Sequence, residues 1–220
     1  MITALIFDFD GLIVDTETPD YRSWQEAYAA HGVVLSMDVW ALNVGSGHLF
    51  NPYDHLEALI GRPLDRDAVR RDVRARFREL LGTPAPLPGV RAYLSAAADL
   101  GLQVGLASSS SRAWVTGFLG QLGLLGQFAA ICTADDVART KPEPDLYLAA
   151  LARLGVAPAR AVALEDSPNG VRAAQAAGMR GVAVPNPVTR LTDLSHADLV
   201  LPGLDALPLP DLLARLAALP

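Results

Sequence analysis

The sequence has very little lysine and very little cysteine. Its 220 residues include 18 basic side chains, of which one, Lys141, is a lysine and the others are arginine. The single cysteine, Cys132, excludes a disulfide within the chain, and the apolar run FAAIC around it indicates a core residue. Lysine is a compact point charge, whereas arginine is a broad planar fork. Lys141 is therefore either the remnant of a drift toward arginine or a position that needs an ammonium group.

The chain also lacks an excess of positive charge and a long apolar run. Its net charge of −6 argues against a nucleic-acid partner, which usually selects a basic surface. No apolar stretch approaches the roughly 20 residues of a membrane span, and the N-terminal MITALIFDFD has no basic region typical of a secretion signal. With 51% hydrophobic and 19% charged residues, the composition predicts a well-packed core. We expect a cytoplasmic monomer with no membrane partner.

Short apolar runs alternate with helical patterns along most of the chain. The runs begin with ALIFDF at 4–9 and end with DLVLP at 198–202. Each is bounded by glycine, proline or polar residues, which is typical of buried strands. The other expected strands are 103–108, 129–133, 161–165 and 181–185, and the helices between them are 88–101, 144–156 and 167–179. This alternation predicts an α/β fold with a doubly wound, Rossmann-like parallel sheet.

One region interrupts the alternation. Residues 16–82 contain no convincing strand, and 21–32 and 65–82 have helical patterns. A proline-rich linker, GTPAPLPG, follows at 82–89. We therefore predict a catalytic core of residues 1–15 and 86–220 and a small helical cap of residues 16–85, inserted after the first strand.

The second cap helix carries arginine at every fourth position. Such a row is either a patch for an anionic ligand or a solvated face whose arginines pair with nearby acids, and the second interpretation is favoured. The arginines are Arg66, Arg70, Arg74 and Arg78.

Two pairs of acids stand at expected strand ends. Asp8 and Asp10 lie at the carboxyl end of the first strand, framed by apolar residues, and Glu165 and Asp166 lie at another strand end, before a helix. Ligands of open α/β sheets bind at this edge, and adjacent buried carboxylates repel unless a cation lies between them. Mg²⁺ is a hard cation that prefers such oxygen ligands. The alternatives are solvated loop acids for the first pair and a helix N-cap for the second.

Serines follow the second strand, in GLASSSSR at 105–112, and their hydroxyl and amide groups could hold a phosphate. By itself this segment could equally be a serine-rich turn. Taken together with the acids, however, it predicts a phosphoryl-transfer site in which Lys141 neutralises charge beside Asp8.

The motifs DFDGLIVDTE (8–17), LASSS (106–110), KPEPDLY (141–147) and LEDSPNG (164–170) resemble those of the haloacid dehalogenase superfamily. The similarity is to the subgroup with a helical cap that includes β-phosphoglucomutase and many small-molecule phosphatases. It implies a Mg²⁺-dependent phosphomonoesterase acting on a small phosphorylated metabolite through an aspartyl-phosphate. The resemblance assigns Asp8 as nucleophile, Asp10 as acid and base, Ser108 and the Ser109 amide as phosphate ligands, Lys141 as charge bridge, and Asp8, Asp10, Glu165 and Asp166 as the metal site.

Two alternatives remain at this point. A sugar phosphomutase shares the chemistry but needs a second anion-binding group, and Asp20 stands where the mutase relatives have a histidine. A receiver domain, a phospho-acceptor from another class, would use Asp135 or Asp136 after the third strand. Substrate specificity is expected in the cap, where the polar residues that could face the site are Asp20, Asn43, Ser46, His48 and Asn51.

Overall fold

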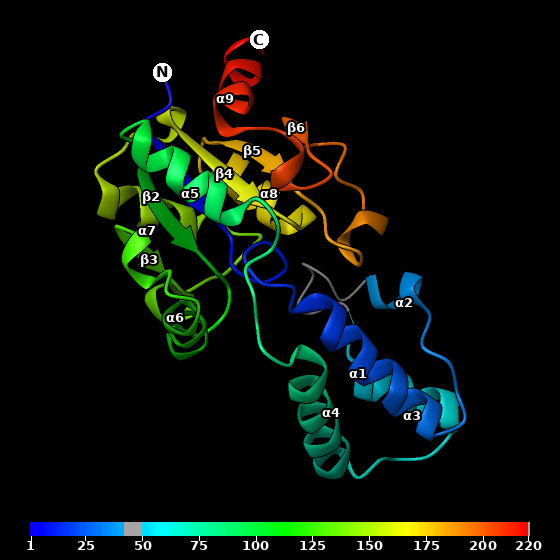
Figure 1. Cartoon of the computed structure of the whole chain (residues 1–220). Coiled ribbons are helices and arrows are strands. Elements are labelled where there is room, and N and C mark those ends of the chain that lie inside the picture. The colour runs from blue at the N-terminus through cyan, green and yellow to red at the C-terminus, as the bar shows by residue number, and fades with distance from the viewer. Residues whose placement is uncertain (42–49, 220) are drawn as a thin grey trace.

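A computed structural model of the chain describes residues 1–41 and 50–219 and shows a parallel sheet with helices on both faces (Figure 1). The strands are β1 (Ala4–Phe7), β2 (Gln103–Ala107), β3 (Ala130–Cys132), β4 (Ala161–Glu165), β5 (Arg180–Ala183) and β6 (Leu199–Val200). Their order along the sheet is β3-β2-β1-β4-β5-β6, and every neighbouring pair is parallel. The order reverses between β1 and β4, which is where an open α/β sheet binds its ligand.

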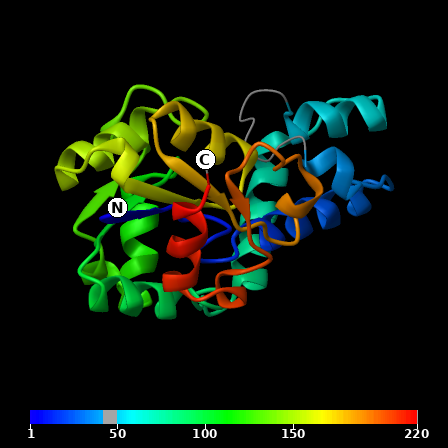
Figure 2. The ribbon, with the colours of Figure 1, turned by 90° about the horizontal axis from the view of Figure 1, so that it is seen from above.

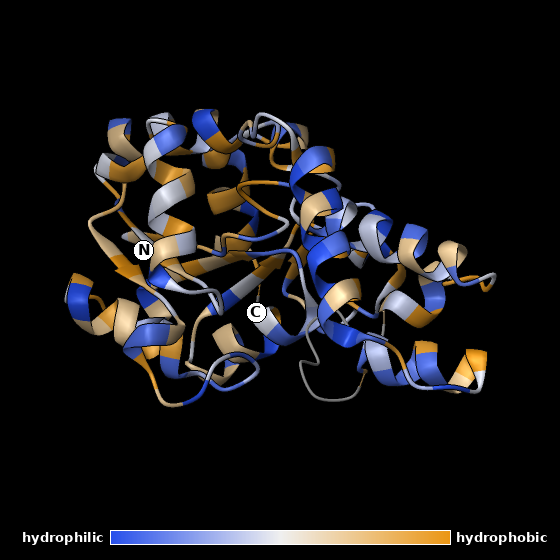
Figure 3. Cartoon of the chain, turned by 90° about the horizontal axis from the view of Figure 1, so that it is seen from below, coloured by the Kyte–Doolittle hydropathy of each residue, from blue (hydrophilic) through white to orange (hydrophobic). Residues whose placement is uncertain are grey.

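Helices cover both faces of this sheet. They are α5 (Val90–Asp99), α6 (Arg112–Gln121), α7 (Asp145–Leu154), α8 (Pro168–Ala176) and α9 (Leu209–Ala217). Apolar residues of α5, α6 and α9 pack on one face, and those of α7 and α8 pack on the other (Figure 2). β1 is buried along its whole length, as expected for a central strand covered on both sides, and Figure 3 shows hydrophobic colours along strands of the sheet and on the helices around it.

A separate helical unit lies beyond the carboxyl end of β1 (Figure 1). Its helices are α1 (Glu17–Ala30), α2 (Met37–Ala41), α3 (Pro52–Ile60) and α4 (Arg66–Leu81). The unit has its own apolar core, in which Trp24, Tyr28 and Trp40 are buried, and α1 packs against α4. None of the described helices combines the length and apolarity needed to cross a bilayer.

The expected fold class is confirmed, with differences in detail. β1 ends at Phe7 rather than at residue 9, so Asp8 and Asp10 follow the strand instead of closing it. α2, α3, α6 and α9 were not expected from the sequence. α3 nevertheless begins at a clear signal, because the Asn51 side chain accepts hydrogen bonds from the amides of Tyr53 and Asp54.

Candidate active site

The predicted acids meet at the carboxyl ends of β1 and β4. The Asp8 amide donates to the Leu164 carbonyl at 2.9 Å, which extends the β1–β4 pairing by one residue and fixes the start of the loop. Asp8 and Asp166 are buried, with 6% and 3% of their surface exposed, and Glu165 is wholly buried. Single oxygen atoms of these three carboxylates lie within 4.8 Å of one another. The ends of β1 and β4 thus concentrate negative charge at one point, on side chains that are almost fully buried.

Lys141 is the cation of this cluster. Its ammonium contacts the Asp8 carboxylate, donates to the Ala107 carbonyl at 2.8 Å and lies 2.6 Å from Oε1 of Glu165. The Tyr147 hydroxyl also donates to Glu165. An ammonium has three N–H groups, and all three have a protein acceptor here. A phosphoryl group that bound Lys141 would have to replace one of these acceptors.

Asp10 has a different environment from Asp8. Its Oδ1 accepts hydrogen bonds from the Thr16 hydroxyl at 3.1 Å and from Nε1 of Trp114 at 2.9 Å. Its Oδ2 accepts from the hydroxyls of Ser110 at 2.7 Å and Ser108 at 3.4 Å. Donors from the loop after β1, the loop after β2 and helix α6 therefore orient this one carboxylate.

Asp166 is held against the loop that follows β1. The Asn186 amide donates to Oδ2 of Asp166 at 2.7 Å and to the Gly11 carbonyl at 3.3 Å. Gly11 has φ +77°, and a Cβ atom there would overlap both the Asp166 carboxylate and the Asn186 amide. A glycine is required at this position because any side chain would push the Asp166 carboxylate out of the site.

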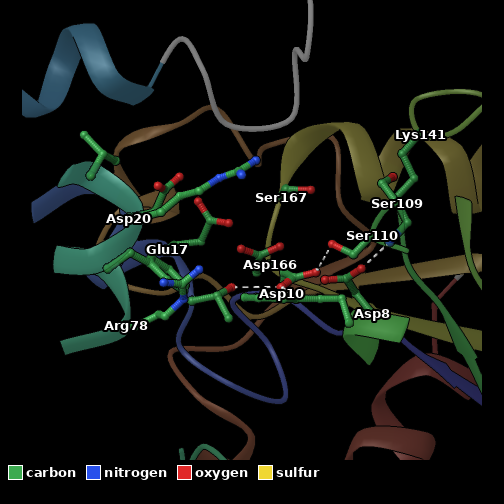
Figure 4. Close-up of a pocket in the computed structure, with 15 residues that line it drawn as sticks. Asp8, Asp10, Glu17, Asp20, Arg78, Ser109, Ser110, Lys141, Asp166 and Ser167 are labelled. Carbon is green, nitrogen blue, oxygen red and sulfur yellow. Dashed lines mark hydrogen bonds and ion pairs between the residues drawn. The ribbon is translucent and has the colours of Figure 1, made fainter. Parts of the chain in front are cut away.

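A cavity of about 660 Å³ opens over these groups, between the sheet and the helical unit. Figure 4 shows Asp8, Asp10, Asp166 and Lys141 on one side and Glu17, Asp20 and Arg78 on the other. The cavity is large enough for a small metabolite and not only for inorganic phosphate. Its lining residues are Asp8, Asp10, Thr16, Glu17, Asp20, Val73, Arg74, Phe77, Arg78, Ser109, Ser110, Trp114, Lys141, Asp166 and Ser167.

Burial determines the protonation of the site. It raises the pKa of Asp8 to about 8, although the positive charge of Lys141 opposes the shift. Burial and the neighbouring Asp8 raise the pKa of Asp166 well above its usual value. Burial would lower the pKa of Lys141, but the carboxylates of Asp8 and Glu165 outweigh it and raise that pKa. One ammonium therefore does not compensate for the acids gathered here.

Acids of the helical unit are affected in the same way. Burial, followed by repulsion from Asp20, raises the pKa of Glu17 to about 8. Burial, followed by repulsion from Asp10, raises the pKa of Asp20 to about 6. The opposite wall of the cavity therefore becomes more negative as pH rises.

The acidic cluster could hold a metal ion. Asp8 and Asp166 line the cavity and present hard oxygen donors, which suit a small divalent cation. Glu165 belongs to the same cluster, but its carboxylate is occupied by Lys141 and Tyr147 and does not line the cavity. The residues present thus fit a cation held through Asp8 and Asp166, with Glu165 holding Lys141 in place.

A sequence model of the haloacid dehalogenase-like hydrolases matches residues 5–184. The chain belongs to this family. The presumed phosphatase YhcW of Bacillus subtilis (strain 168) is 51% identical over 189 residues, which are 86% of each chain. Hexitol phosphatase B of Escherichia coli (strain K12) is 36% identical over 196 residues, covering 84% of this chain and 85% of that protein.

One solved structure that is similar to this chain contains a bound ligand. A variant of CbbY from Rhodobacter sphaeroides, crystallised with xylulose 1,5-bisphosphate, has a TM-score of 0.69 and 30% identity to this chain. The match covers 93% of this chain and 96% of that one. The chain is therefore a phosphatase of the subgroup related to β-phosphoglucomutase, and the resemblance read from its motifs is confirmed.

The structure brings most of the predicted core residues of the phosphatase together. Ser109 lines the cavity, and Ser108, which is 1% exposed, lies beneath it. Asp20 also lines the cavity, whereas Asn51 caps α3 and does not line it. The roles assigned to these residues stay predictions. The remaining substrate candidates, Asn43, Ser46 and His48, lie outside the described residues.

The receiver-domain alternative is wrong, because the chain is a haloacid dehalogenase-like hydrolase. The structure also gives its two candidate acceptors other partners. Asp135 accepts from the amide of Arg112 at 2.7 Å, and Asp136 accepts from the guanidinium of Arg153 at 2.7 Å. Both acids stabilise the segment after β3.

Sequence reasoning missed several groups around the site. Trp114 and Asn186 come from distant parts of the chain, and no local pattern marks them. Tyr147 lies inside the quoted segment KPEPDLY and could have been noticed there. The preferred interpretation of the arginine row holds only in part, because Arg66 and Arg70 pair with acids whereas Arg74 and Arg78 line the cavity.

Proposed function

We propose that this phosphatase is a Mg²⁺-dependent phosphomonoesterase that forms an aspartyl-phosphate on Asp8. The observation that carries the proposal is the joint placement of Asp8, Lys141 and Asp166 at the floor of one cavity, at the reversal point of the sheet. A carboxylate nucleophile, a fixed ammonium and a second acid are the groups that phosphoryl transfer needs for attack and charge stabilisation.

In the first step an oxygen of Asp8 attacks phosphorus, and the bond from phosphorus to the ester oxygen breaks. Asp10 gives its proton to that departing oxygen, so that an alcohol leaves. In the second step Asp10 takes a proton from water, whose oxygen attacks phosphorus and releases Asp8 and inorganic phosphate. Ser108 and the Ser109 amide hold the phosphoryl oxygens, and Lys141 balances negative charge beside Asp8.

Asp8 and Asp166 would hold Mg²⁺, together with the backbone carbonyl of Asp10. A divalent cation there supplies positive charge that favours the ionised form of both carboxyl groups and stabilises the phosphoryl oxygens. Glu165 contributes by orienting Lys141, with which its carboxylate is in contact.

The decisive experiment is Asp8→Asn, which keeps the shape of the side chain and removes the nucleophile. Phosphate release from a panel of small phosphate esters with Mg²⁺ should disappear, while circular dichroism shows an intact fold. Asp99→Asn is the matched control, because Asp99 is an exposed residue at the end of α5. Near-normal turnover by the Asp8 variant would refute the assignment.

The helical unit acts, in this proposal, as a cap that selects the substrate. Arg74 and Arg78 line the cavity from α4, and neither has a hydrogen bond or ion pair from its side chain to another described residue. Guanidinium groups that line the cavity and have no partner among the described residues favour a substrate with a second anionic group, since arginine binds phosphate and carboxylate in a bidentate manner. The bisphosphate bound to the CbbY variant has such a group, whereas a hexitol phosphate has a neutral tail.

Fructose 6-phosphate and fructose 1,6-bisphosphate test this preference. Arg74→Gln and Arg78→Gln should each raise KM for the bisphosphate about tenfold and leave KM for the monophosphate within about twofold. Arg70→Gln, on the same helix but paired with Asp67 at 3.0 Å, is the control and should change neither. Equal changes for both substrates would remove the arginines from substrate recognition.

A mutase is the second candidate, because Arg74 and Arg78 line the cavity and would be able to bind the second anionic group that a mutase requires. Asp20 opposes it, since an acid stands at the cavity wall where mutase relatives have a histidine. Incubation with β-glucose 1-phosphate and a trace of the bisphosphate separates the two. A hydrolase releases inorganic phosphate without glucose 6-phosphate, whereas a mutase isomerises the sugar with little free phosphate.

A further inference from the structure

The two oxygens of the Asp10 carboxylate have different kinds of partner. Oδ2 is bonded to Ser110 and Ser108, which belong to the segment proposed to hold the phosphoryl group. Phosphate binding would therefore compete for these hydroxyls. Oδ1 is bonded to Thr16 and Trp114, neither of which belongs to that segment. When the serine hydroxyls rotate to donate to a bound phosphate, Oδ1 of Asp10 keeps its two donors and Oδ2 becomes free to exchange a proton.

Trp114 is part of a row of aromatic rings that crosses from the helical unit to the nucleophile loop. Its ring lies 5.9 Å from Phe77 on α4 and 4.6 Å from Phe118 on α6. Phe118 lies 6.0 Å from the buried Phe9, which stands between the two catalytic aspartates in the chain. Ring contacts at these distances are favourable and depend on orientation. The indole is thus fixed on one side by α4 and on the other by the core of the sheet unit.

The indole N–H is well suited to fix a carboxylate without taking part in its proton exchange. It is a donor only, so it has no lone pair that could accept the proton of Asp10. Thr16, the other donor to Oδ1, has a hydroxyl that rotates and can also accept a hydrogen bond. Trp114 is therefore the donor that holds Oδ1 in one direction.

We propose that Trp114 is a positioning residue that couples the placement of α4 to the orientation of Asp10. With Phe77 packed on the indole, Trp114 holds Oδ1 and turns Oδ2 toward the cavity, where the leaving oxygen takes its proton. When α4 moves away, the indole loses a packing partner and Asp10 loses its fixed direction. This inference rests on the proposed function, since it gives Asp10 the role of acid and base.

The test uses two substrates that need a general acid to different extents. An alkyl phosphate such as glycerol phosphate expels a basic alkoxide and needs the proton of Asp10, whereas p-nitrophenyl phosphate expels a stable anion. Trp114→Phe keeps an aromatic ring and removes the N–H. We expect kcat/KM for the alkyl ester to fall about tenfold or more, and that for the aryl ester to change less than about threefold.

Phe77→Leu tests the link to α4. It removes the ring contact and leaves the indole N–H in place, and it should reproduce the selective loss on the alkyl ester. The double variant should be no worse than Trp114→Phe alone if both act through the same hydrogen bond. Trp24→Phe is the control. It also replaces an indole by a phenyl ring, but Trp24 lies in the core of the helical unit and does not line the cavity.

The outcomes separate this inference from the proposed function. Equal losses on both esters, or no loss on either, would show that Trp114 is only a packing residue. A wild-type chain that releases no phosphate from any ester would instead overturn the proposed function itself. Additive effects of Phe77→Leu and Trp114→Phe would remove the coupling to α4 while leaving the hydrogen bond to Asp10 in place.

Discussion

The chain's single lysine stands at a position where the three-dimensional arrangement of acceptors excludes arginine. Its side chain is 7% exposed and lies among a carbonyl, two carboxylates and the ring of Tyr147. Three acceptors around a point match the tetrahedral ammonium, whereas a guanidinium spreads five N–H groups in a plane. Arg76 and Arg139, in contrast, are themselves exposed where they pair with acids, so the broad head group has room there.

Lys141→Arg tests this explanation. The larger head group should displace Asp8 or Glu165, and we expect kcat to fall about a hundredfold or more, which corresponds to roughly 2.7 kcal/mol of transition-state stabilisation. Steady-state phosphate release measures the effect, and Arg139→Lys, at a residue paired with Asp145 at 3.0 Å and 62% exposed, is the reverse control. A loss below about threefold would support neutral drift instead.

At the scale of elements, the sequence was most informative about the sheet. All six expected strands are present because each is a short apolar run bounded by strong turn residues, and such runs need no tertiary information. The helix α6 was missed because Gly117 and Gly120 lower its intrinsic propensity, and it is stabilised by burial of Val115 and Leu119. Its Ser111 cap was present in the sequence and could have been used.

The candidate site shows the same contrast between residues that a local sequence pattern marks and residues that only tertiary packing brings into place. Asp8, Asp10, Glu165 and Asp166 could be proposed from the sequence because they stand at the ends of strand patterns, and parallel strands bring their ends together. Trp114 contacts Asp10 across 104 positions of the chain, and only the packing of α6 places it there. The arginine row could not be divided from sequence alone, since a repeat of four residues does not reveal which members face acids and which face a cavity.

Two glycines, one in α8 and one in α6, predict opposite effects of alanine on the free energy of unfolding. Gly170 lies in α8, where an added Cβ would overlap the carboxylate of Glu165, whereas nothing lies within 4 Å of a Cβ added at Gly117 in α6. Gly170→Ala should lower the free energy of unfolding by about 1–3 kcal/mol and reduce activity through Glu165 and Lys141.

Gly117→Ala should act in the opposite direction and raise the free energy of unfolding by about 0.4–1 kcal/mol, because alanine restricts the unfolded chain. Urea denaturation followed by circular dichroism measures both, with unchanged m-values as the check on two-state behaviour. Stabilisation by both alanines would show that Glu165 can move without cost and that α8 does not constrain the site.

Over the whole molecule, the acids form two groups with opposite pH behaviour. Surface acids pair with arginine, as Glu57 does with Arg66, which holds the pKa of Glu57 down to about 2. Cavity acids are desolvated, and the pKa of Asp8 and Glu17 is raised to about 8. The first group stabilises the fold once pH exceeds the usual carboxylate range. The second group destabilises it progressively at higher pH.

The sign of the second effect follows from proton binding. Between the ordinary carboxylate range and about pH 8, the folded state keeps protons on Asp8 and Glu17 that the unfolded chain has released, so the free energy of unfolding falls as pH rises. Each retained proton corresponds to about 1.4 kcal/mol per pH unit. Asp20, with a pKa raised to about 6, adds to the decline only in the lower part of this range.

Thermal unfolding in chelator should therefore show a melting temperature that decreases from about pH 5.5 to about pH 8. Mg²⁺ should counteract the decrease, because it binds ionised carboxylates and only the folded state brings Asp8 and Asp166 together. The stabilisation by Mg²⁺ should be larger at pH 8 than at pH 5.5, since fewer protons must then be displaced.

Asp166→Asn should abolish the Mg²⁺ response and flatten the pH dependence in chelator, whereas Asp99→Asn should leave both unchanged. A melting temperature that is constant with pH, or a Mg²⁺ shift that persists in the Asp166 variant, would place the cation elsewhere in the molecule.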